Sequence, residues 1–503
     1  MTEREGPVVA TGRGRVRGVV TPAPAGFGPG GAVAAFRGIP YAASPVGELR
    51  FAAPREHPVW HDVRDAAHSG PAVPQNASRL NAVMGHRVPD WDEEGCLNLN
   101  VWTPADALGA GSTPRPVLVW IHGGGFSSGS GGWDWYDGAR LAALGDLTVV
   151  TINYRVGPLG YLHLPAVGAV NLGAQDQGAA LRWVRENISA FGGDPGLVTV
   201  GGQSAGAHSA LALATDPDTA ALVRRVILQS APLGLAPQES DDAAATAAAY
   251  VRLLGLAGAA DVGKALRALP VEQLLEGFGQ LMAGLTRSPG DVTPVMRPVL
   301  GGPGQPGTWQ RALADGMLDG KDVLIGTVDT EMTAFLALDP RMRAFTPDEA
   351  RDALSRLTDR LTTGAPARVE PLDRDVSPGQ AFVERVGDLF FGDGTTKLAA
   401  HRAAHGTPAY VYRFTRRPDP DDLGLGCPHC AELPFLFNTF DAYPDAPMLG
   451  AVDDEDRALG RAFGGALAAF TATGSPNGEG LAAWHPYGGG PDPCVMRFGP
   501  RPR

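Results

Sequence analysis

The sequence predicts an α/β fold, with a mostly parallel central sheet and helices on both of its faces. The runs Val117–Ile121 and Leu147–Ile152 are largely apolar and contain no charged residue, as expected of strands that are covered on both faces. Between residues 175 and 191 the apolar residues recur at roughly helical spacing, and a further apolar run follows at 197–200. Strands that alternate with helices in this way are typical of parallel α/β sheets.

The remaining elements extend this fold toward both ends of the chain. Residues 8–40 alternate short β-prone runs with glycine turns, which indicates an antiparallel opening. We expect a helix from 204 to 213, then a strand at 226–228 and a helical stretch at 240–287. An irregular Gly- and Pro-rich connection at 288–309 and two more strands at 323–326 and 409–414 follow. No linker separates an independent domain. We therefore expect residues 1–503 to form a single domain, with 232–320 as a largely helical insertion that caps the functional site.

Composition and charge exclude several classes of function. The 503 residues carry a net charge of -12, which argues against nucleic acid or an anionic membrane surface as the main partner. The first ten residues lack the apolar segment of a secretory signal, and no run reaches the length of a membrane span, so we expect a cytoplasmic protein. The preference for Arg over Lys, with abundant Ala and Gly, indicates a GC-rich genome. The sequence does not determine the oligomeric state.

A G-x-S-x-G motif stands where a strand should turn into a helix. Gly202 and Gly206 flank Ser204, and this pattern lets the chain turn sharply and lifts the serine oxygen above the edge of the sheet. Ser204 is therefore a candidate nucleophile. In a chain with 68 glycines, the alternative is an ordinary Gly-Ser turn.

A second glycine-rich segment, His122-Gly123-Gly124-Gly125, follows the predicted strand Val117–Ile121. Successive glycines let the backbone approach a ligand closely, and this position is typical of an oxyanion hole. We expect the N–H groups of Gly124 and Gly125 to bind a developing negative charge, together with that of Ala205 at the start of the next helix. The alternative is a flexible loop. The residues expected to line the adjoining pocket are Phe126, Ser127 and Ser128.

Further blocks of the chain resemble the type-B carboxylesterases, an α/β-hydrolase family that includes bacterial p-nitrobenzyl esterases and animal cholinesterases. The resemblance runs nearly from end to end of the chain, and its blocks lie at 36–42, 96–104, 153–155, 176–177 and 191–195. It implies an α/β-hydrolase fold, a catalytic triad in the order Ser, Glu, His, and no cofactor. Gln203 departs from the family, which usually has Glu before the nucleophile.

The resemblance also implies the other two members of the triad. The segment from Gly326 to Glu331 is similar to the family's Gly-x-x-x-Asp-Glu, so Glu331 is the expected acid, with Asp329 as its rival. The segment 428–435 is similar to His-Gly-x-Glu-Leu-x-Phe and supplies His429, with Cys430 in place of the glycine. In such a triad the histidine takes the proton of the attacking serine, and the acid orients the imidazole. Ser230, after Ile227-Leu228-Gln229, is either a donor behind the triad or an ordinary serine at the end of a strand.

Several alternatives remain open at this point. Cys427 and Cys430 form a Cys-x-x-Cys that is compatible with zinc or redox chemistry, but no second paired-ligand motif accompanies them, so we expect no metal. The leading hypothesis is a serine carboxylesterase that hydrolyses small to medium, uncharged esters through an acyl-enzyme on Ser204. The same site would also serve carbamates, amides or lactones. A third hypothesis is a non-catalytic binding protein of this fold.

Overall fold

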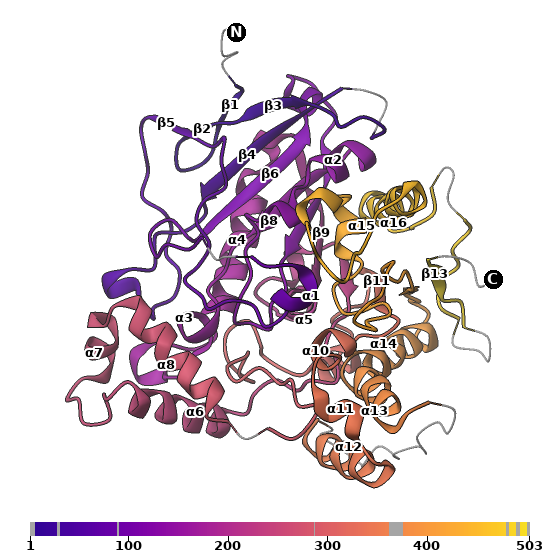
Figure 1. Cartoon of the computed structure of the whole chain (residues 1–503). Helices are drawn as coiled ribbons and strands as arrows, with labels where there is room; N and C mark the ends of the chain where they lie inside the picture. Colours follow the sequence, from indigo (N-terminus) through magenta and orange to yellow (C-terminus); the bar gives the residue numbers. More distant parts are fainter. Residues whose placement is uncertain are drawn as a thin grey trace.

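The computed structural model describes residues 6–27, 31–87, 90–285, 287–361, 376–478, 482–488 and 493–499 (Figure 1). Two sheets are present in this part of the chain. The larger sheet consists of β3 (Val19–Pro22), β4 (Ala32–Pro40), β6 (Asn98–Pro104), β7 (Arg115–Ile121), β8 (Thr148–Ile152), β9 (Gly193–Gln203), β10 (Arg225–Gln229), β11 (Asp322–Val328), β12 (Tyr410–Phe414) and β13 (Met496–Phe498). The smaller sheet consists of β1 (Val8–Ala10), β2 (Arg15–Arg17) and β5 (Val63–Asp65).

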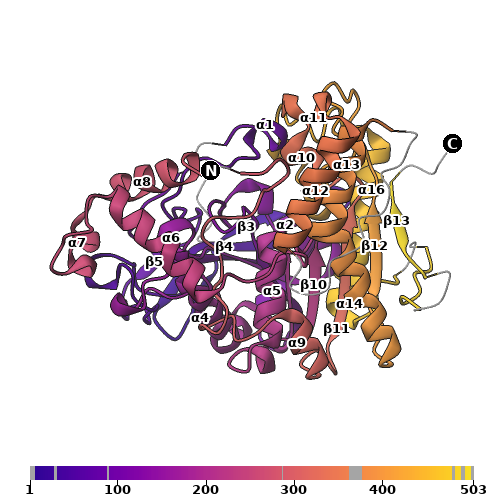
Figure 2. The same cartoon turned by 90° about the horizontal axis from the view of Figure 1, so that it is seen from below.

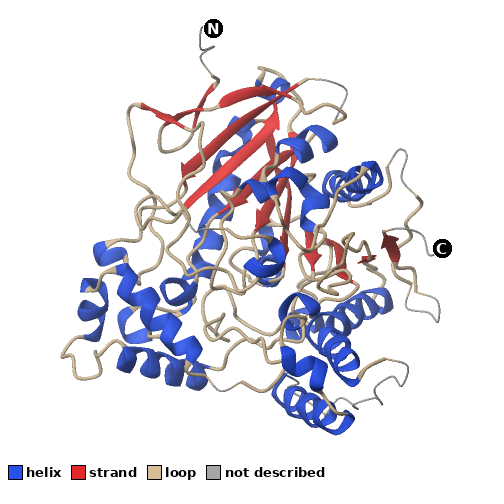
Figure 3. Ribbon diagram, viewed as in Figure 1, coloured by secondary structure: helices blue, strands red, loops and turns tan. Residues whose placement is uncertain are grey.

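The ten strands of the larger sheet follow the order β13-β12-β11-β10-β9-β7-β8-β6-β4-β3 (Figure 3). All pairs from β13 to β8 are parallel, whereas β6, β4 and β3 add an antiparallel edge. This topology confirms both the mostly parallel sheet and the antiparallel opening that the sequence predicts. It also brings the carboxyl ends of β7, β9 and β11 to the same edge of the sheet.

The side chains of the central strands alternate between two hydrophobic cores. In β7, Val117, Val119 and Ile121 belong to one core, and Leu118 and Trp120 belong to the other. This alternation explains why the strand is apolar throughout, since both of its faces are buried.

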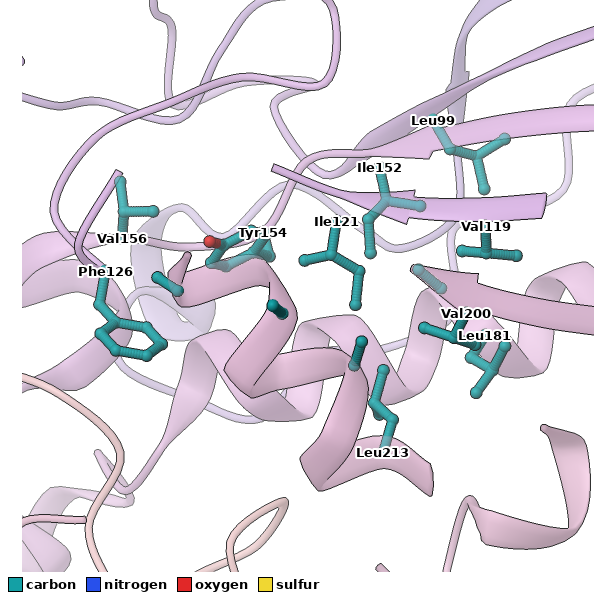
Figure 4. Close-up of a cluster of buried hydrophobic side chains, with 14 of the residues drawn as sticks. Leu99, Val119, Ile121, Phe126, Ile152, Tyr154, Val156, Leu181, Val200 and Leu213 are labelled. Carbon is teal, nitrogen blue, oxygen red and sulfur yellow. The ribbon is translucent and has the colours of Figure 1, made fainter. Parts of the chain in front are cut away.

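Helices cover both faces of this sheet. The first core is closed by α4 (Leu172–Asn187), α5 (Ala205–Thr215) and α14 (Asp393–Ala404), and the second by α2 (Ala139–Gly145), α15 (Leu433–Phe437) and α16 (Asp454–Thr473). Figure 4 shows the first core, where Val119 and Val200 of neighbouring strands lie beside Leu181 of α4 and Leu213 of α5. The predicted α/β architecture is thus confirmed on both faces.

Two helical blocks stand apart at the side of the molecule that carries the carboxyl ends of these strands (Figures 1 and 2). The first consists of α6 (Ser240–Leu253), α7 (Val262–Ala268) and α8 (Val271–Ala283), within the helical stretch that the sequence predicts. The second consists of α10 (Thr333–Leu336), α11 (Pro340–Ala344), α12 (Pro347–Leu361) and α13 (Pro378–Gly387), which the sequence patterns did not indicate. The remaining helices are α1 (Asn81–Met84), α3 (Gly157–Tyr161) and α9 (Trp309–Ala314). Of the helices that the structure describes, none combines the length and apolar character needed to cross a bilayer.

Candidate active site

Ser204 occupies the sharp turn between β9 and α5. Its backbone has φ 58° and ψ -123°, a strained conformation that non-glycine residues rarely adopt. Two backbone hydrogen bonds hold it there, because Ser204 donates its N–H to the carbonyl of Gln229 at 2.9 Å and accepts from the N–H of His208 at 3.0 Å. The strain is therefore imposed by the neighbouring strand and by the first turn of α5.

The two glycines of the motif are required by close backbone approaches. A Cβ at Gly206 would lie 2.0 Å from the carbonyl oxygen of Ile121, and a Cβ at Gly202 would lie 2.4 Å from the carbonyl carbon of Gly206. Because both neighbours are backbone atoms, no rotamer change can relieve such a clash. The G-x-S-x-G motif is therefore a packing requirement at this turn and not an accident of composition.

The glycine loop after β7 lies directly against the nucleophile. A Cβ at Gly123 would lie 3.3 Å from Ser204 Cβ and 2.8 Å from Gln203 Oε1. Gly124 and Gly125 both have positive φ, 116° and 60°, and a Cβ at Gly124 would meet the carbonyl oxygen of Ser128 at 2.0 Å. The loop can follow this path only with glycine at its centre.

Buried polar contacts fix this loop from behind. Gln75 Oε1 accepts from the N–H of Gly129 at 2.6 Å, and Tyr154 donates its hydroxyl to the carbonyl of His122 at 2.9 Å. The rings of His122 and Tyr154 are stacked at 4.4 Å, and burial lowers the pKa of His122 to about 4. His122 is therefore uncharged at neutral pH and acts as a packing residue of the loop.

The structure brings Glu331 and His429 together from distant parts of the chain. Glu331 Oε2 lies 2.6 Å from His429 Nδ1, and Glu331 Oε1 accepts from the N–H of Val328 at 3.0 Å. Both oxygens of the carboxylate are thus held at the end of β11. Asp329, the rival acid, instead lies 3.3 Å from Arg413 Nε. The carboxylate in contact with His429 is therefore that of Glu331.

His429 is almost fully buried and is packed by two aromatic rings. Phe335 lies 5.3 Å and Phe391 4.8 Å from the imidazole, measured between ring centroids. With the Nδ1 proton donated to Glu331, Nε2 accepts from the side-chain amide of Gln203, whose Nε2 lies 3.2 Å away. Ser204 lines the same cavity as His429, but none of the described hydrogen bonds joins the two side chains. Contacts between nucleophile and base are often loose before substrate binds.

A second carboxyl lies behind His429. Glu432 is fully buried, and Ser230 donates its hydroxyl to Glu432 Oε1 at 3.5 Å, which places Ser230 behind the site as expected. Burial, together with the charge of Glu331, raises the pKa of Glu432 to about 8. Glu432 is therefore mostly protonated at neutral pH, and the carboxyl in contact with the imidazole is that of Glu331.

A narrow cavity of about 40 Å³ opens on the nucleophile. It is lined by the expected residues Gly124, Gly125, Ser128, Ser204 and His429. It is also lined by residues that the motifs did not indicate, most of them apolar or aromatic: Ser78, Arg79, Leu80, Met84, Trp133, Trp135, Tyr136 and Phe335. The tryptophans and Tyr136 follow the glycine loop closely in the sequence, and that aromatic cluster was the available signal. The residues at 78–84 and at 335 come from distant segments of the chain, and no sequence pattern indicated that they line the cavity.

Two of the three residues expected to line the pocket are absent from this lining. The Phe126 ring lies in the first core, 5.2 Å from Tyr161 and 5.7 Å from His208 between ring centroids (Figure 4). Ser127 donates its hydroxyl back to the carbonyl of Gly124 at 3.2 Å. The expectation for Phe126 is corrected for a physical reason, since its positive φ of 60° belongs to a turn that directs the ring into the core. Ala205 is also buried, at the first position of α5.

Cys427 and Cys430 have separate surroundings. Cys427 donates its thiol to the carbonyl of Phe414 at 3.2 Å, whereas Cys430 lines the cavity next to His429. Burial raises the pKa of both thiols well above the ordinary range. Across the described ranges, no three His, Cys, Asp or Glu side chains meet in an arrangement that could hold a metal ion.

Comparisons with known proteins agree with this architecture. A family model described as "Carboxylesterase family" matches residues 5–503. Phenmedipham hydrolase of Pseudarthrobacter oxydans is 37% identical over 469 residues, which cover 92% of this chain and 91% of that protein. Para-nitrobenzyl esterase of Bacillus subtilis is 34% identical over 486 residues, covering 95% of this chain and 92% of that protein.

Solved structures extend the similarity to three dimensions. A PNB esterase structure superposes with a TM-score of 0.81 at 33% identity, over 95% of this chain and 93% of the other. The carboxylesterase EST55 of Geobacillus stearothermophilus superposes with a TM-score of 0.81 at 34% identity, over 98% and 96% of the two chains. The predicted α/β-hydrolase fold is thereby confirmed. Because the family model and these relatives cover nearly the whole chain, the protein belongs to the carboxylesterase family, in its type-B, PNB esterase-like branch, and is a serine carboxylic ester hydrolase.

Proposed function

We propose that Ser204, His429 and Glu331 form the catalytic triad of this ester hydrolase. The observation that carries the proposal is the 2.6 Å contact between Glu331 and His429, in a cavity that Ser204 also lines. His429 Nε2 takes the proton of Ser204 as the serine oxygen attacks the acyl carbon, and it then returns this proton to the leaving alkoxide. Water repeats the cycle on the acyl-enzyme and releases the acid.

In the proposed mechanism, the N–H groups of Gly124, Gly125 and Ala205 bind the oxyanion of the tetrahedral intermediate. The close approach of the glycine loop to Ser204 and the position of Ala205 at the start of α5 support this assignment. Donors that are held in place before the reaction stabilise the transition state without reorganisation. Gln203 has to release His429 Nε2 for the proton transfer, and rotation of its side-chain amide would be sufficient.

The proposed substrates are small to medium, uncharged carboxylic esters. The mostly apolar and aromatic lining of the cavity supports this choice, because such walls bind hydrocarbon groups and exclude water. Its small volume favours compact acyl groups unless the walls move apart. The name of one similar protein, para-nitrobenzyl esterase, agrees with hydrolysis of an ester, and that of another, phenmedipham hydrolase, agrees with a hydrolase.

We also propose that residues 232–320 act as a cap over this site. Two contacts support the proposal, since Val292 accepts a hydrogen bond from Arg79 at 2.8 Å and Pro294 Cγ lies 3.9 Å from where a Cβ of Gly125 would be. The net charge of -12 supports an enzyme that binds neither nucleic acid nor anionic membranes.

The proposal is tested by hydrolysis of p-nitrophenyl acetate, butyrate and octanoate. Replacing Ser204 with Ala should lower kcat by several orders of magnitude, as triad deletions do. Ser189→Ala, an exposed serine far from the cavity, is the matched control and should hydrolyse all three esters at the wild-type rate. A Ser204→Ala variant that keeps wild-type activity, or a wild-type protein no faster than buffer, would overturn the assignment.

A further inference from the structure

Arg79 stands out among the residues around the nucleophile. Of the described residues that line the cavity, it alone carries a formal charge at neutral pH when His429 is neutral. Its neighbours Leu80 and Met84 are buried, whereas Arg79 is exposed at the mouth of the cavity. The guanidinium is therefore within reach of a ligand in the cavity.

The guanidinium is held in place by contacts on two sides. Arg79 Nη1 donates to the carbonyl of Val292 at 2.8 Å, and its Cζ lies 4.9 Å from the centroid of the Phe335 ring. The same ring lies 5.3 Å from the His429 ring, so a single aromatic side chain separates the guanidinium from the imidazole. Stacking on an aromatic ring fixes the plane of an arginine while leaving its edge free for hydrogen bonds.

The free edge of Arg79 faces the glycine loop. Its Nη2 lies 3.3 Å from where a Cβ of Gly125 would be, so any side chain at that position would crowd the guanidinium. The guanidinium thus approaches the proposed oxyanion hole closely. A group bound there lies within a few bonds of the ester carbonyl.

Arg79 has no carboxylate partner within the described ranges, where none of the ion pairs includes it. Two buried arginines of the scaffold differ in this respect, since Arg155 lies 2.7 Å from Asp176 and Arg416 lies 2.6 Å from Asp456. The surrounding protein, together with the positive charge of Arg287, lowers the pKa of Arg79 to about 10, and the nearby carboxylate of Asp291 opposes this shift without forming an ion pair with Arg79. The side chain is still charged at neutral pH, and none of the ion pairs in the described ranges holds its guanidinium.

We propose that Arg79 is a specificity-determining residue that binds a carboxylate carried by the ester, on either its acyl or its alcohol part. This inference rests on the proposed function of Ser204, and it adds hemiesters and carboxyaryl esters to the uncharged substrates. A guanidinium binds a carboxylate through two parallel hydrogen bonds, which fix orientation as well as adding affinity. The contact exists in both the bound ester and the transition state, so it lowers KM more than it raises kcat.

Two matched pairs of esters test the proposal and separate the two positions of the carboxylate. Mono-4-nitrophenyl glutarate against 4-nitrophenyl butyrate tests the acyl side, and 4-acetoxybenzoate against phenyl acetate tests the alcohol side. The variants are Arg79→Met, which keeps length without charge, and Arg79→Lys, which keeps the charge. Arg311→Met is the control, because Arg311 is exposed on α9, pairs with Asp315 and does not line the cavity.

In at least one pair, Arg79→Met should lower kcat/KM for the anionic ester by about 10- to 100-fold, as expected for a lost hydrogen bond between charged groups. The loss should appear mainly as a higher KM. The neutral ester should change less than twofold, Arg79→Lys should restore part of the loss, and Arg311→Met should resemble the wild type. Equal losses for both members of each pair would show a packing role and overturn the proposal, as would the absence of any loss. Wild-type hydrolysis of the neutral esters, with its loss in Ser204→Ala, reports separately on the proposed function.

Discussion

The two halves of the proposed catalytic site are built in different ways. The nucleophile half, Ser204 with the glycine loop, is fixed by backbone atoms that approach so closely that only glycine fits. The base half, Glu331 with His429, is fixed by side chains from segments 98 residues apart, through one short hydrogen bond and two packed aromatic rings. The geometry of the nucleophile half thus depends on the absence of side chains. The geometry of the base half depends on the charge and the contacts of the side chains present there.

This difference determines what a substitution does in each half. Adding one carbon atom to the nucleophile half displaces backbone and affects folding. Changing one atom in the base half leaves the backbone in place and affects the protonation of the imidazole. Adding a side chain in the nucleophile half should therefore lower mainly the stability of the protein, and changing a polar atom in the base half should lower mainly its activity.

The largest expected effect is that of Gly206→Ala. Its new Cβ would lie 2.0 Å from the carbonyl oxygen of Ile121, and relief requires β7 and α5 to move apart. We expect a loss of about 4 kcal/mol or more in the free energy of unfolding, measured by urea denaturation, as for other severe core clashes. Gly465→Ala is the control, because a Cβ at Gly465 in α16 meets nothing within 4 Å. It should stabilise the protein by up to about 1 kcal/mol. Similar behaviour of the two variants would contradict the close packing of this turn.

The second effect is on the chemical step, in Glu331→Gln. The amide either turns its NH2 toward the N–H of Val328, which leaves two donors face to face, or turns it toward His429 and forces the other imidazole tautomer. In that tautomer Nε2 carries the proton and cannot accept one from Ser204. We expect kcat for p-nitrophenyl butyrate to fall by about 10⁴-fold, as in other triads with an amide in place of the acid. The melting temperature should change little.

Asp329→Asn separates the two acids. Asp329 pairs with Arg413 and does not touch His429, so this variant should keep kcat close to that of the wild type. If Asp329→Asn and Glu331→Gln lost activity equally, the assignment of Glu331 as the acid would fail.

The last effect concerns the carboxyl behind His429 and is spread over several pH units as a pH dependence of stability. Burial and the charge of Glu331 raise the pKa of Glu432 from 4.5 to about 8. A group with a raised folded pKa stabilises the fold fully below its unfolded pKa, and this contribution is lost as the pH rises through the folded pKa. Relative to Glu432→Gln, the free energy of unfolding of the wild type should fall by about 1.4 kcal/mol for each pH unit between the two values. Chemical denaturation at pH 5, 6, 7 and 8 measures this difference, and the exposed Glu186→Gln should show none. A constant difference across this range would mean that Glu432 is ionised in the folded protein.

The same contrast explains what the sequence could predict. The strands β7 and β8, the turn at Ser204 and the glycine loop are specified by short runs of residues, and each lies where its pattern indicates. Glu331 and His429 follow no local rule, and only their resemblance to family segments pointed to them. In the second helical block, α10 and α11 are too short for a periodic signal, whereas the buried apolar residues of α12 recur at helical spacing and could have predicted that helix.

The cavity wall was the least predictable part. Arg79 and Phe335 meet there from segments far apart in the sequence, and no local pattern links them. Phe126 shows the converse, because its place in the sequence next to the glycine loop suggested the pocket, while its backbone conformation turns the ring into the core.

Covalent labelling of the nucleophile tests the central claim most directly. The native protein would be treated with an alkyl fluorophosphonate, which phosphonylates activated serines, and analysed by intact mass and peptide mapping. The account predicts a single adduct on Ser204, absent in Ser204→Ala and formed far more slowly in Glu331→Gln. An adduct on another serine, such as Ser128 in the same cavity, or an unlabelled Ser204 in an active enzyme, would contradict it.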